Sequence, residues 1–173
     1  MHLHLKLKDK RILIVDDEPD VLDTLEEYLE GCRLFRASSF QEAKEILETQ
    51  ELDLAILDIM GVDGYRLLDL ANKKGIPAVM LTAHAFSPDN LMKSIQKGAY
   101  SYIPKEKISE IEDFLVDVLE AREKDQNPWQ KWQTRLPETY FEKRWGKAWK
   151  DMDKEFWETF KASIEERKKS KAP

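Results

Sequence analysis

Acidic, hydroxyl and basic side chains stand at the ends of short apolar runs in this chain. Asp16 and Asp17 follow the first run, and Asp58 follows the third. Thr82 closes the fourth run, and Lys105 comes just after the fifth. If the runs are parallel strands, their carboxyl ends share one edge of a sheet, which is where ligands bind in such folds. The pattern therefore predicts one pocket that combines carboxylates, a hydroxyl and an ammonium group.

These residue types suit phosphoryl chemistry. Carboxylates gathered in one pocket repel one another, so one pKa must rise or a cation must bind. Mg²⁺ is the hard divalent ion that such oxygen ligands favour. An ammonium group and a hydroxyl beside it suit a phosphoryl group, the first by charge and the second by a hydrogen bond. A carboxylate can itself attack phosphorus while a metal neutralises charge on the transferring oxygens, which predicts an aspartyl-phosphate site.

The elements that must position these residues follow a regular rhythm. Apolar runs alternate with helix-length amphipathic segments up to about Arg122, as in βα units that build a parallel sheet. We predict strands at residues 11–15, 32–37, 52–57, 77–82 and 100–103. The helices carry their own start signals, such as a capping box of Ser39 and Glu42 and a proline directly after Ser87. The predicted fold class is α/β, a (βα)5 doubly wound parallel five-stranded sheet followed by a helical C-terminal extension.

Four stretches resemble, in order and setting, the receiver domain of bacterial two-component response regulators. They are ILIVDDEPD, AILDIM, VMLTAH and KGAYSYIPK. The resemblance covers residues 9–122 and implies the flavodoxin-like form of the fold, as in chemotaxis regulators. It implies a phosphoacceptor signalling protein rather than an enzyme, with catalysis limited to its own phosphorylation and dephosphorylation. The implied partner is a sensor histidine kinase or a phosphotransfer protein.

The resemblance also assigns roles to positions that match the family's motifs. Asp58 would accept the phosphoryl group from a phosphohistidine. Asp17, Asp58 and the backbone carbonyl of Met60 would bind Mg²⁺ directly, and Asp16 would act mainly through water. Mg²⁺ is therefore the cofactor that we expect.

Three further positions would respond to the phosphate. Lys105 would form an ion pair with it, and Thr82 would move to donate a hydrogen bond to it. Tyr102, three residues before the lysine, matches the family's aromatic switch, which turns inward when the threonine moves. A plain packing aromatic is the alternative for Tyr102.

The match departs from the family in two places. The family usually has a proline three residues after the phosphoacceptor and a glycine eight after it, whereas Gly61 and Gly64 stand three and six residues after Asp58. The family also tends to have a proline directly after its lysine, but here Pro104 precedes Lys105. We expect a shorter loop after Asp58, with consequences for access to the phosphate and for its lifetime.

Charge is unevenly placed along the chain. Residues 1–121 carry 14 basic and 24 acidic residues, a net charge of −10, whereas residues 122–173 carry 14 and 10, a net charge of +4. A single cysteine, Cys32, fits a reducing compartment. No apolar run approaches the roughly 20 residues of a membrane helix, and the N-terminus lacks the apolar stretch of a signal peptide. We therefore expect a cytoplasmic protein that has no membrane partner.

The composition also suggests boundaries along the chain. We predict an N-terminal extension at 1–8, a receiver domain at 9–122, a linker at 123–128 and a Trp-rich helical extension at 129–173. Asn127 should cap a short helix that begins at Pro128. A longer helix should begin at Pro137 and reach toward Lys168, with a break or bend at Gly146.

Aromatic residues recur at helical spacing in this extension. The apolar stripe consists of Phe141, Trp145, Trp149, Met152, Phe156, Phe160 and Ile164. Its aromatic area is on the order of 1,000 Å², more than a soluble monomer usually exposes. Three surfaces could bury this stripe: the chain's own receiver, a second copy of the chain, or another protein on which the extension docks under the control of phosphorylation.

Output through protein contact is therefore the expected function, either with an unknown output protein or in a self-dimer. The contact would use the face from the fourth to the fifth helix or the C-terminal extension. The alternative is a transcriptional regulator whose basic extension contacts DNA. We expect no nucleic-acid partner, since a net charge of +4 is a small attraction and no compact helix-turn-helix is evident.

Overall fold

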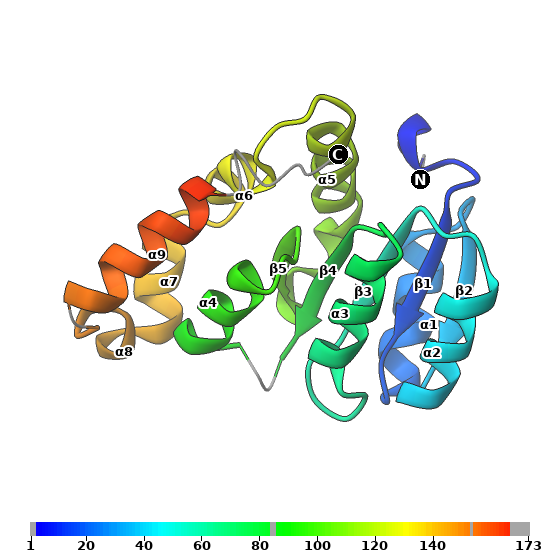
Figure 1. Cartoon of the computed structure of the whole chain (residues 1–173), viewed down its shortest axis with the longest axis horizontal. Helices are drawn as coiled ribbons and strands as arrows, with labels where there is room; N and C mark the ends of the chain where they lie inside the picture. The colour runs from blue at the N-terminus through cyan, green and yellow to red at the C-terminus, as the bar shows by residue number, and fades with distance from the viewer. Residues whose placement is uncertain (1–2, 84–85, 153, 167–173) are drawn as a thin grey trace.

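The described residues of the computed structural model, 3–83, 86–152 and 154–166, form a parallel sheet covered by helices, with further helices beyond one edge (Figure 1). The strand order is β2-β1-β3-β4-β5. Each neighbouring pair of strands is parallel. The predicted fold class, a five-stranded doubly wound α/β sheet followed by C-terminal helices, is confirmed.

The elements of the sheet region begin and end within a few residues of the predicted bounds. The strands are β1 (Arg11–Val15), β2 (Arg33–Ala37), β3 (Leu54–Leu57), β4 (Ala78–Thr82) and β5 (Ser101–Pro104). The helices are α1 (Pro19–Tyr28), α2 (Phe40–Thr49), α3 (Gly64–Lys73), α4 (Pro88–Gln96) and α5 (Ile111–Glu123), with short 3₁₀ helices η1 (Leu5–Leu7) and η2 (Lys105–Glu110). The 3₁₀ turn η2 follows β5 directly and continues into α5.

Side chains cap these helices as their sequence signals predict. The Ser39 hydroxyl accepts a hydrogen bond from the Glu42 amide at 3.2 Å, while the Glu42 carboxylate accepts one from the Ser38 amide at 3.0 Å. At the start of α4, the Ser87 hydroxyl accepts from the Asn90 amide at 3.1 Å. Each cap satisfies a first-turn N–H group that has no partner within its helix.

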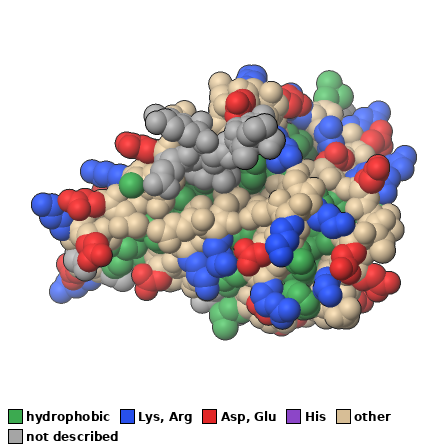
Figure 2. Space-filling model, viewed as in Figure 1, with side chains coloured by type: hydrophobic (Ala, Val, Ile, Leu, Met, Phe, Trp, Pro, Cys, Tyr) green, Lys and Arg blue, Asp and Glu red, His purple; other side chains and the backbone are tan. Residues whose placement is uncertain are grey.

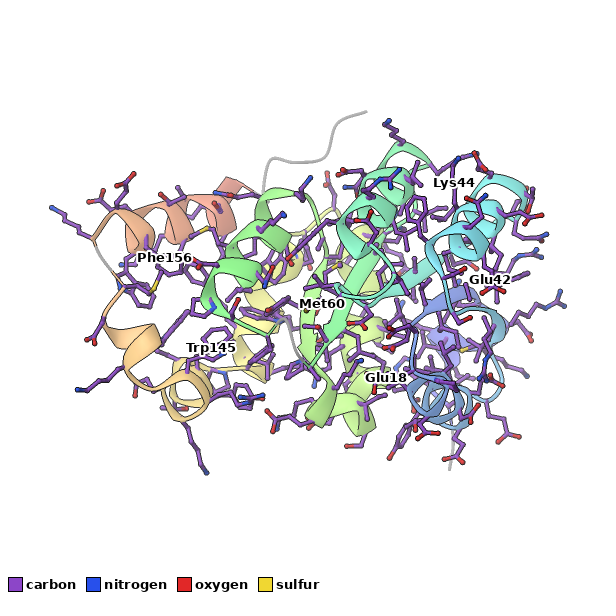
Figure 3. All side chains as sticks on the ribbon, turned by 90° about the horizontal axis from the view of Figure 1, so that it is seen from below. Glu18, Glu42, Lys44, Met60, Trp145 and Phe156 are labelled. Carbon is purple, nitrogen blue, oxygen red and sulfur yellow. The ribbon has the colours of Figure 1, made fainter. Side chains whose placement is uncertain are left out.

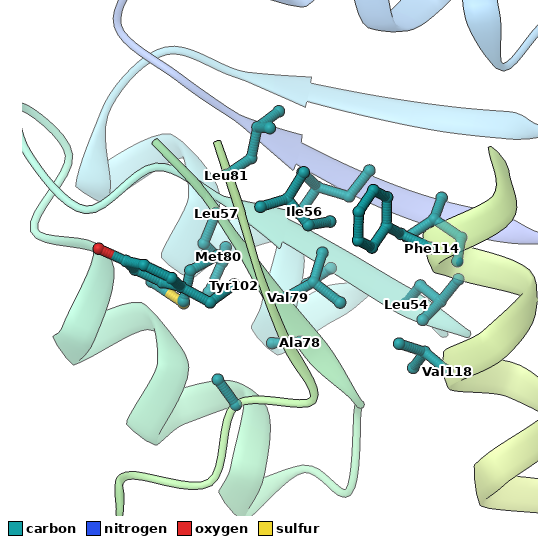
Figure 4. Packing of buried hydrophobic residues seen from close by; sticks show 14 of the residues in the cluster. Leu54, Ile56, Leu57, Ala78, Val79, Met80, Leu81, Tyr102, Phe114 and Val118 are labelled. Carbon is teal, nitrogen blue, oxygen red and sulfur yellow. The ribbon is translucent and has the colours of Figure 1, made fainter. Parts of the chain in front are cut away.

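The main core lies between the sheet and its helices. β3 and β4 are buried along their whole length, as expected for strands that helices cover on both faces. Figure 4 shows Leu54, Ile56 and Val79 directed toward Phe114 and Val118 of α5. Because right-handed crossovers that run in opposite directions place their helices on opposite faces, α1 lies across the sheet from α2, α3 and α4. The sheet is thereby a rigid platform for the loops at its carboxyl edge.

The C-terminal helices form a separate layer beyond β5 and beside α4 (Figure 1). They are α6 (Pro128–Arg135), α7 (Glu138–Trp145), α8 (Lys147–Lys150) and α9 (Lys154–Glu166). Asn127 caps α6, as predicted, because its side-chain oxygen accepts from the Trp129 amide at 2.9 Å. The break or bend expected at Gly146 is present, and this glycine has φ of +53°. A second break, after α8, was not predicted, so the segment forms three helices rather than one helix with a single break. The predicted end at Lys168 lies outside the described residues.

The N-terminal segment is held against the sheet region more closely than an exposed extension would be. Leu7 is fully buried, and the Lys6 ammonium lies 2.9 Å from the Glu123 carboxylate at the end of α5. Figure 2 shows basic and acidic side chains interspersed over one face of the molecule. Among the described residues, no helix combines the length and the apolar character that crossing a membrane requires.

Candidate functional site

Four of the sequence-predicted residues meet at the carboxyl edge of the sheet. Asp16 follows β1 and Asp58 follows β3, and both carboxylates are buried. The Lys105 ammonium, which follows β5, lies 2.9 Å from the Asp16 carboxylate and 3.5 Å from that of Asp58. Thr82, at the end of β4, is buried and hydrogen-bonded to Asp58. The ends of four strands, β1, β3, β4 and β5, therefore bring acidic, basic and hydroxyl groups together.

Burial makes Asp58 an unusual carboxylate. Removal from water, together with the neighbouring charge of Asp16, raises the pKa of Asp58 to about 6. The Lys105 ammonium, the Ile59 amide and the Thr82 hydroxyl oppose this rise. The Ile59 amide donates to the Asp58 carboxylate at 2.9 Å. At neutral pH the group is still mostly ionised and able to act as a nucleophile.

Lys105 holds the acidic groups together. Burial alone would lower its pKa, but hydrogen bonds to Asp16 and Glu18 raise the pKa above its usual value. Burial raises the pKa of Asp16, and the hydrogen bond from Lys105 opposes that shift. The ammonium is therefore charged at neutral pH and has three carboxylates within 3.5 Å, those of Asp16, Glu18 and Asp58.

The first loop supplies a group of carboxylates that suits a divalent cation. Oxygen atoms of Asp16, Asp17 and Glu18 lie within 4.8 Å of one another. Asp17 is exposed at this loop, and a Cβ atom added to Gly61 would lie 2.3 Å from its carboxylate. Oxygen donors of this kind fit Mg²⁺. Glu18 was expected in this pocket because it directly follows the acidic pair after the first strand, but the sequence assigned it no specific role.

The loop after Asp58 is tight, as its shorter glycine spacing predicts. The Gly64 amide donates to the Ile59 carbonyl at 3.0 Å, and Asp63 adopts a left-handed conformation with φ of +55°. A Cβ atom at Gly64 would lie 1.9 Å from the Asp58 carbonyl oxygen. Met60 lies on this loop with its side chain 56% exposed (Figure 3). Only glycine allows the start of α3 to approach Asp58 this closely.

Tyr102 of β5 points inward, away from solvent. Its ring is fully buried and stacks on Phe86 with 5.2 Å between ring centroids. Its hydroxyl accepts a hydrogen bond from the Ser87 amide at 2.9 Å. Burial raises the pKa of Tyr102, so the hydroxyl stays neutral. Phe86 was not among the predicted site residues, since a phenylalanine in a loop carries no signal of its own.

Comparison with protein families agrees with this geometry. The family model described as the response regulator receiver domain matches residues 12–115, more than half of the chain. Regulatory protein VanR of Enterococcus faecium is 38% identical over 100 residues, which are 55% of this chain and 43% of that protein. Two-component response regulator ARR18 of Arabidopsis thaliana is 35% identical over 102 residues, 55% of this chain and 16% of that protein. The chain thus spans less than half the length of these relatives.

Solved structures show the same fold. A CheY-like response regulator receiver domain protein from Methanospirillum hungatei JF-1 is 35% identical with a TM-score of 0.52, and the match covers 60% of this chain and 94% of that one. The signal receiver domain of a LuxO repressor protein from Vibrio parahaemolyticus is 25% identical with a TM-score of 0.60, over 67% and 95% of the two chains.

Receiver domains of response regulators are phosphoacceptor signalling modules; they typically bind Mg²⁺ and imply a cognate histidine kinase. The sheet order, the acidic loop after β1 and the matched residues 12–115 lead to one assignment. The chain belongs to the response regulator receiver family, with an aromatic-rich helical region after its receiver domain.

Proposed function

We propose that this protein accepts a phosphoryl group from a histidine kinase on Asp58, with Mg²⁺, as the response regulator of a two-component phosphorelay. The observation that carries the proposal is the position of the Lys105 ammonium, 3.5 Å from the buried Asp58 carboxylate and 2.9 Å from Asp16. A buried nucleophile beside a fixed cation and a hydroxyl is what phosphoryl transfer to a carboxylate requires.

The transfer exchanges one bond to phosphorus for another. An Asp58 carboxylate oxygen attacks phosphorus in line, the bond between phosphorus and the histidine nitrogen breaks, and that nitrogen keeps the electron pair. Lys105 forms an ion pair with the transferred group and Thr82 donates a hydrogen bond to it. Asp17, Asp58 and the Met60 carbonyl would hold Mg²⁺, with Asp16 acting through water. The bound metal supplies charge neutralisation on the phosphoryl oxygens.

Direct phosphorylation tests this proposal. Acetyl phosphate with Mg²⁺ should add one phosphoryl group, detected by intact mass, and chelation of Mg²⁺ should prevent it. Asp58→Asn should abolish the addition because the amide is not a nucleophile here. Asp63→Asn is the matched control, since Asp63 is an exposed aspartate of the same loop. Unchanged labelling of the Asp58→Asn protein would contradict the assignment.

We further propose that output passes through protein contact rather than through DNA. Basic groups of the C-terminal helices are already paired with acidic groups of the receiver region. The Arg144 guanidinium lies 2.9 Å from the Glu106 carboxylate, and Arg135 donates to Asp117 of α5. These pairs reduce the positive charge that could attract a phosphate backbone. If the protein retarded mixed-sequence DNA in a gel at moderate salt, that result would support the transcriptional alternative instead.

A further inference from the structure

Two tryptophans of the C-terminal helices donate hydrogen bonds to backbone carbonyls near the phosphorylation site. The Trp132 indole of α6 donates to the Tyr102 carbonyl of β5 at 3.0 Å. The Trp145 indole of α7 donates to the Phe86 carbonyl, between β4 and α4, at 3.0 Å. Phe86 comes four residues after Thr82, and Tyr102 three before Lys105. The helices are thus joined to both segments that carry the groups facing Asp58.

Aromatic contacts connect the same parts. The Phe86 ring stacks on the Tyr102 ring. The centroids of the Phe86 and Trp145 rings are 4.7 Å apart. Phe141 of α7 contacts both indoles, with centroid distances of 5.5 Å to Trp132 and 4.8 Å to Trp145. An unbroken row of rings therefore runs from the inward-facing tyrosine to α7.

Polar contacts hold the segment just after Lys105. The Tyr140 hydroxyl and the Arg144 guanidinium of α7 both donate to the carboxylate of Glu106, the residue that follows the lysine. Further along the chain, Arg135 of α6 donates a hydrogen bond to the carboxylate of Asp117 in α5. The C-terminal helices thereby contact β5 and both flanks of the site through hydrogen bonds as well as apolar packing.

The contacts of the docked helices favour one position of Tyr102 and Thr82 over the other. Thr82 is already hydrogen-bonded to Asp58, and Tyr102 already lies inward with its hydroxyl bonded to Ser87. An outward turn of the Tyr102 ring would break its stacking on Phe86, which Trp145 covers. The docked helices therefore favour the arrangement in which the hydroxyl and the ammonium face the carboxylate.

We propose that Trp132 and Trp145 are positioning residues: through their indole N–H bonds, the docked C-terminal helices hold Tyr102 inward and Thr82 beside Asp58. This proposal rests on the proposed function. Because coupling between two equilibria is reciprocal, phosphorylation of Asp58 stabilises docking of the helices rather than releasing them. The C-terminal helices are then a part of the receiver that reports its phosphorylation state.

Trp→Phe substitutions in the full chain separate the two hydrogen bonds from general packing. Trp132→Phe and Trp145→Phe keep an aromatic ring and remove the donor. Trp129→Phe and Trp149→Phe are matched controls, since both indoles are buried and neither N–H has a partner among the described residues. The initial rate of Asp58 phosphorylation by acetyl phosphate with Mg²⁺ should fall about five-fold in each of the first two variants, as expected for a bond worth about 1 kcal/mol. The controls should stay within about two-fold of the unmodified protein by the same measure.

Hydrogen exchange tests the reciprocal effect. Beryllofluoride, a phosphate mimic, should slow exchange of the α7 amides in the unmodified protein and leave them unchanged in Asp58→Asn. Equal phosphorylation rates in all four Trp variants, faster rates in Trp132→Phe and Trp145→Phe, or faster α7 exchange with beryllofluoride would each overturn the inference. No phosphorylation of any protein would contradict the proposed function itself.

Discussion

Lys105 explains how three carboxylates can share one partly buried edge. Buried charges destabilise a fold unless partners and hydrogen bonds compensate them. The ammonium contacts Asp16, Glu18 and Asp58, and burial leaves Asp58 with a pKa of about 6. Positive charge therefore resides where a transferred phosphoryl group would need it. A second cation, bound by the carboxylates of the acidic loop, would neutralise negative charge that Lys105 leaves uncompensated.

Gly61 gives a prediction at the same scale. Its φ is +85°, and an added Cβ would lie 2.3 Å from the Asp17 carboxylate, so Gly61→Ala should displace Asp17. Gly75→Ala is the control, since Gly75 is also left-handed at φ of +71° but an added Cβ there meets only Arg122, at 3.9 Å. Both variants should lose about 1–2 kcal/mol of stability from backbone strain. Only Gly61→Ala should also require more Mg²⁺ for half-maximal phosphorylation; equal Mg²⁺ requirements would contradict this role.

Most of the site could be predicted from the sequence because its residues stand directly at or after the ends of predicted strands. Each strand of a parallel sheet ends at the same edge, so the places of Asp16, Asp58, Thr82 and Lys105 follow from the strand pattern alone. Phe86 could not be found in this way. Its importance comes from stacking on the ring of Tyr102, a tertiary contact that no local pattern encodes.

At the scale of elements, tertiary packing determines how the aromatic C-terminal segment is divided into helices, which its local sequence pattern did not predict. Helical spacing from Phe141 to Ile164 predicted one stripe on one helix, but α7, α8 and α9 fold back on one another. Trp149 of α8 lies 4.6 Å from Trp157 and 5.1 Å from Phe141 between ring centroids. The rings thus form a cluster, because burial against neighbouring helices outweighs the helix propensity of the turns between them.

The same helices leave a pocket between them that is open to solvent. Its volume is about 720 Å³, and its lining includes Trp132, Leu136 and Phe160. Side chains that line the pocket lack packing partners on that side. Contacts of the helices with β5 and α4 are then important for keeping them docked.

The contact between α7 and Glu106 should make docking depend on pH. A hydrogen bond from Tyr140, followed by one from Arg144, lowers the pKa of Glu106 below its usual 4.5. A lowered pKa in the folded state stabilises docking above about pH 4.5, and that stabilisation is lost as the pH falls through the lowered value. Exchange of the α7 amides, corrected for the intrinsic effect of pH, should therefore accelerate as the solution is acidified below pH 4.5.

Substitution of the carboxyl group isolates this dependence. Glu106→Gln should loosen α7 at neutral pH and reduce the additional loosening on acidification. Glu120→Gln is the control, since Glu120 pairs with Lys124 of the same chain segment at 3.6 Å and not with α7. An identical pH response in the unmodified protein and in Glu106→Gln would show that another group is responsible.

Across the whole molecule, the two regions of unequal charge fit each other. Residues 1–121 have a net charge of −10 and residues 122–173 a net charge of +4. Arg135 and Arg144 bring part of the positive charge to acidic side chains of α5 and η2. The aromatic rings are covered in the same way, since Trp129, Trp132 and Trp149 are buried within a single chain. The receiver contributes to this cover through Tyr102, and the neighbouring C-terminal helices supply the rings that surround Trp149.

Removal of the C-terminal helices should therefore uncover an apolar edge. A chain that ends at Gln126 would expose Phe86 and the β5 edge, and unpaired strand edges promote association between chains. We expect increased binding of an apolar fluorescent dye and a larger mass by light scattering than one chain predicts. Adding Phe86→Ser to the truncated chain should reduce the dye signal if this surface is responsible. Dye binding and mass that match a full-length monomer would mean that these helices cover little, and that the contacts of Trp132 and Trp145 are not what shields β5.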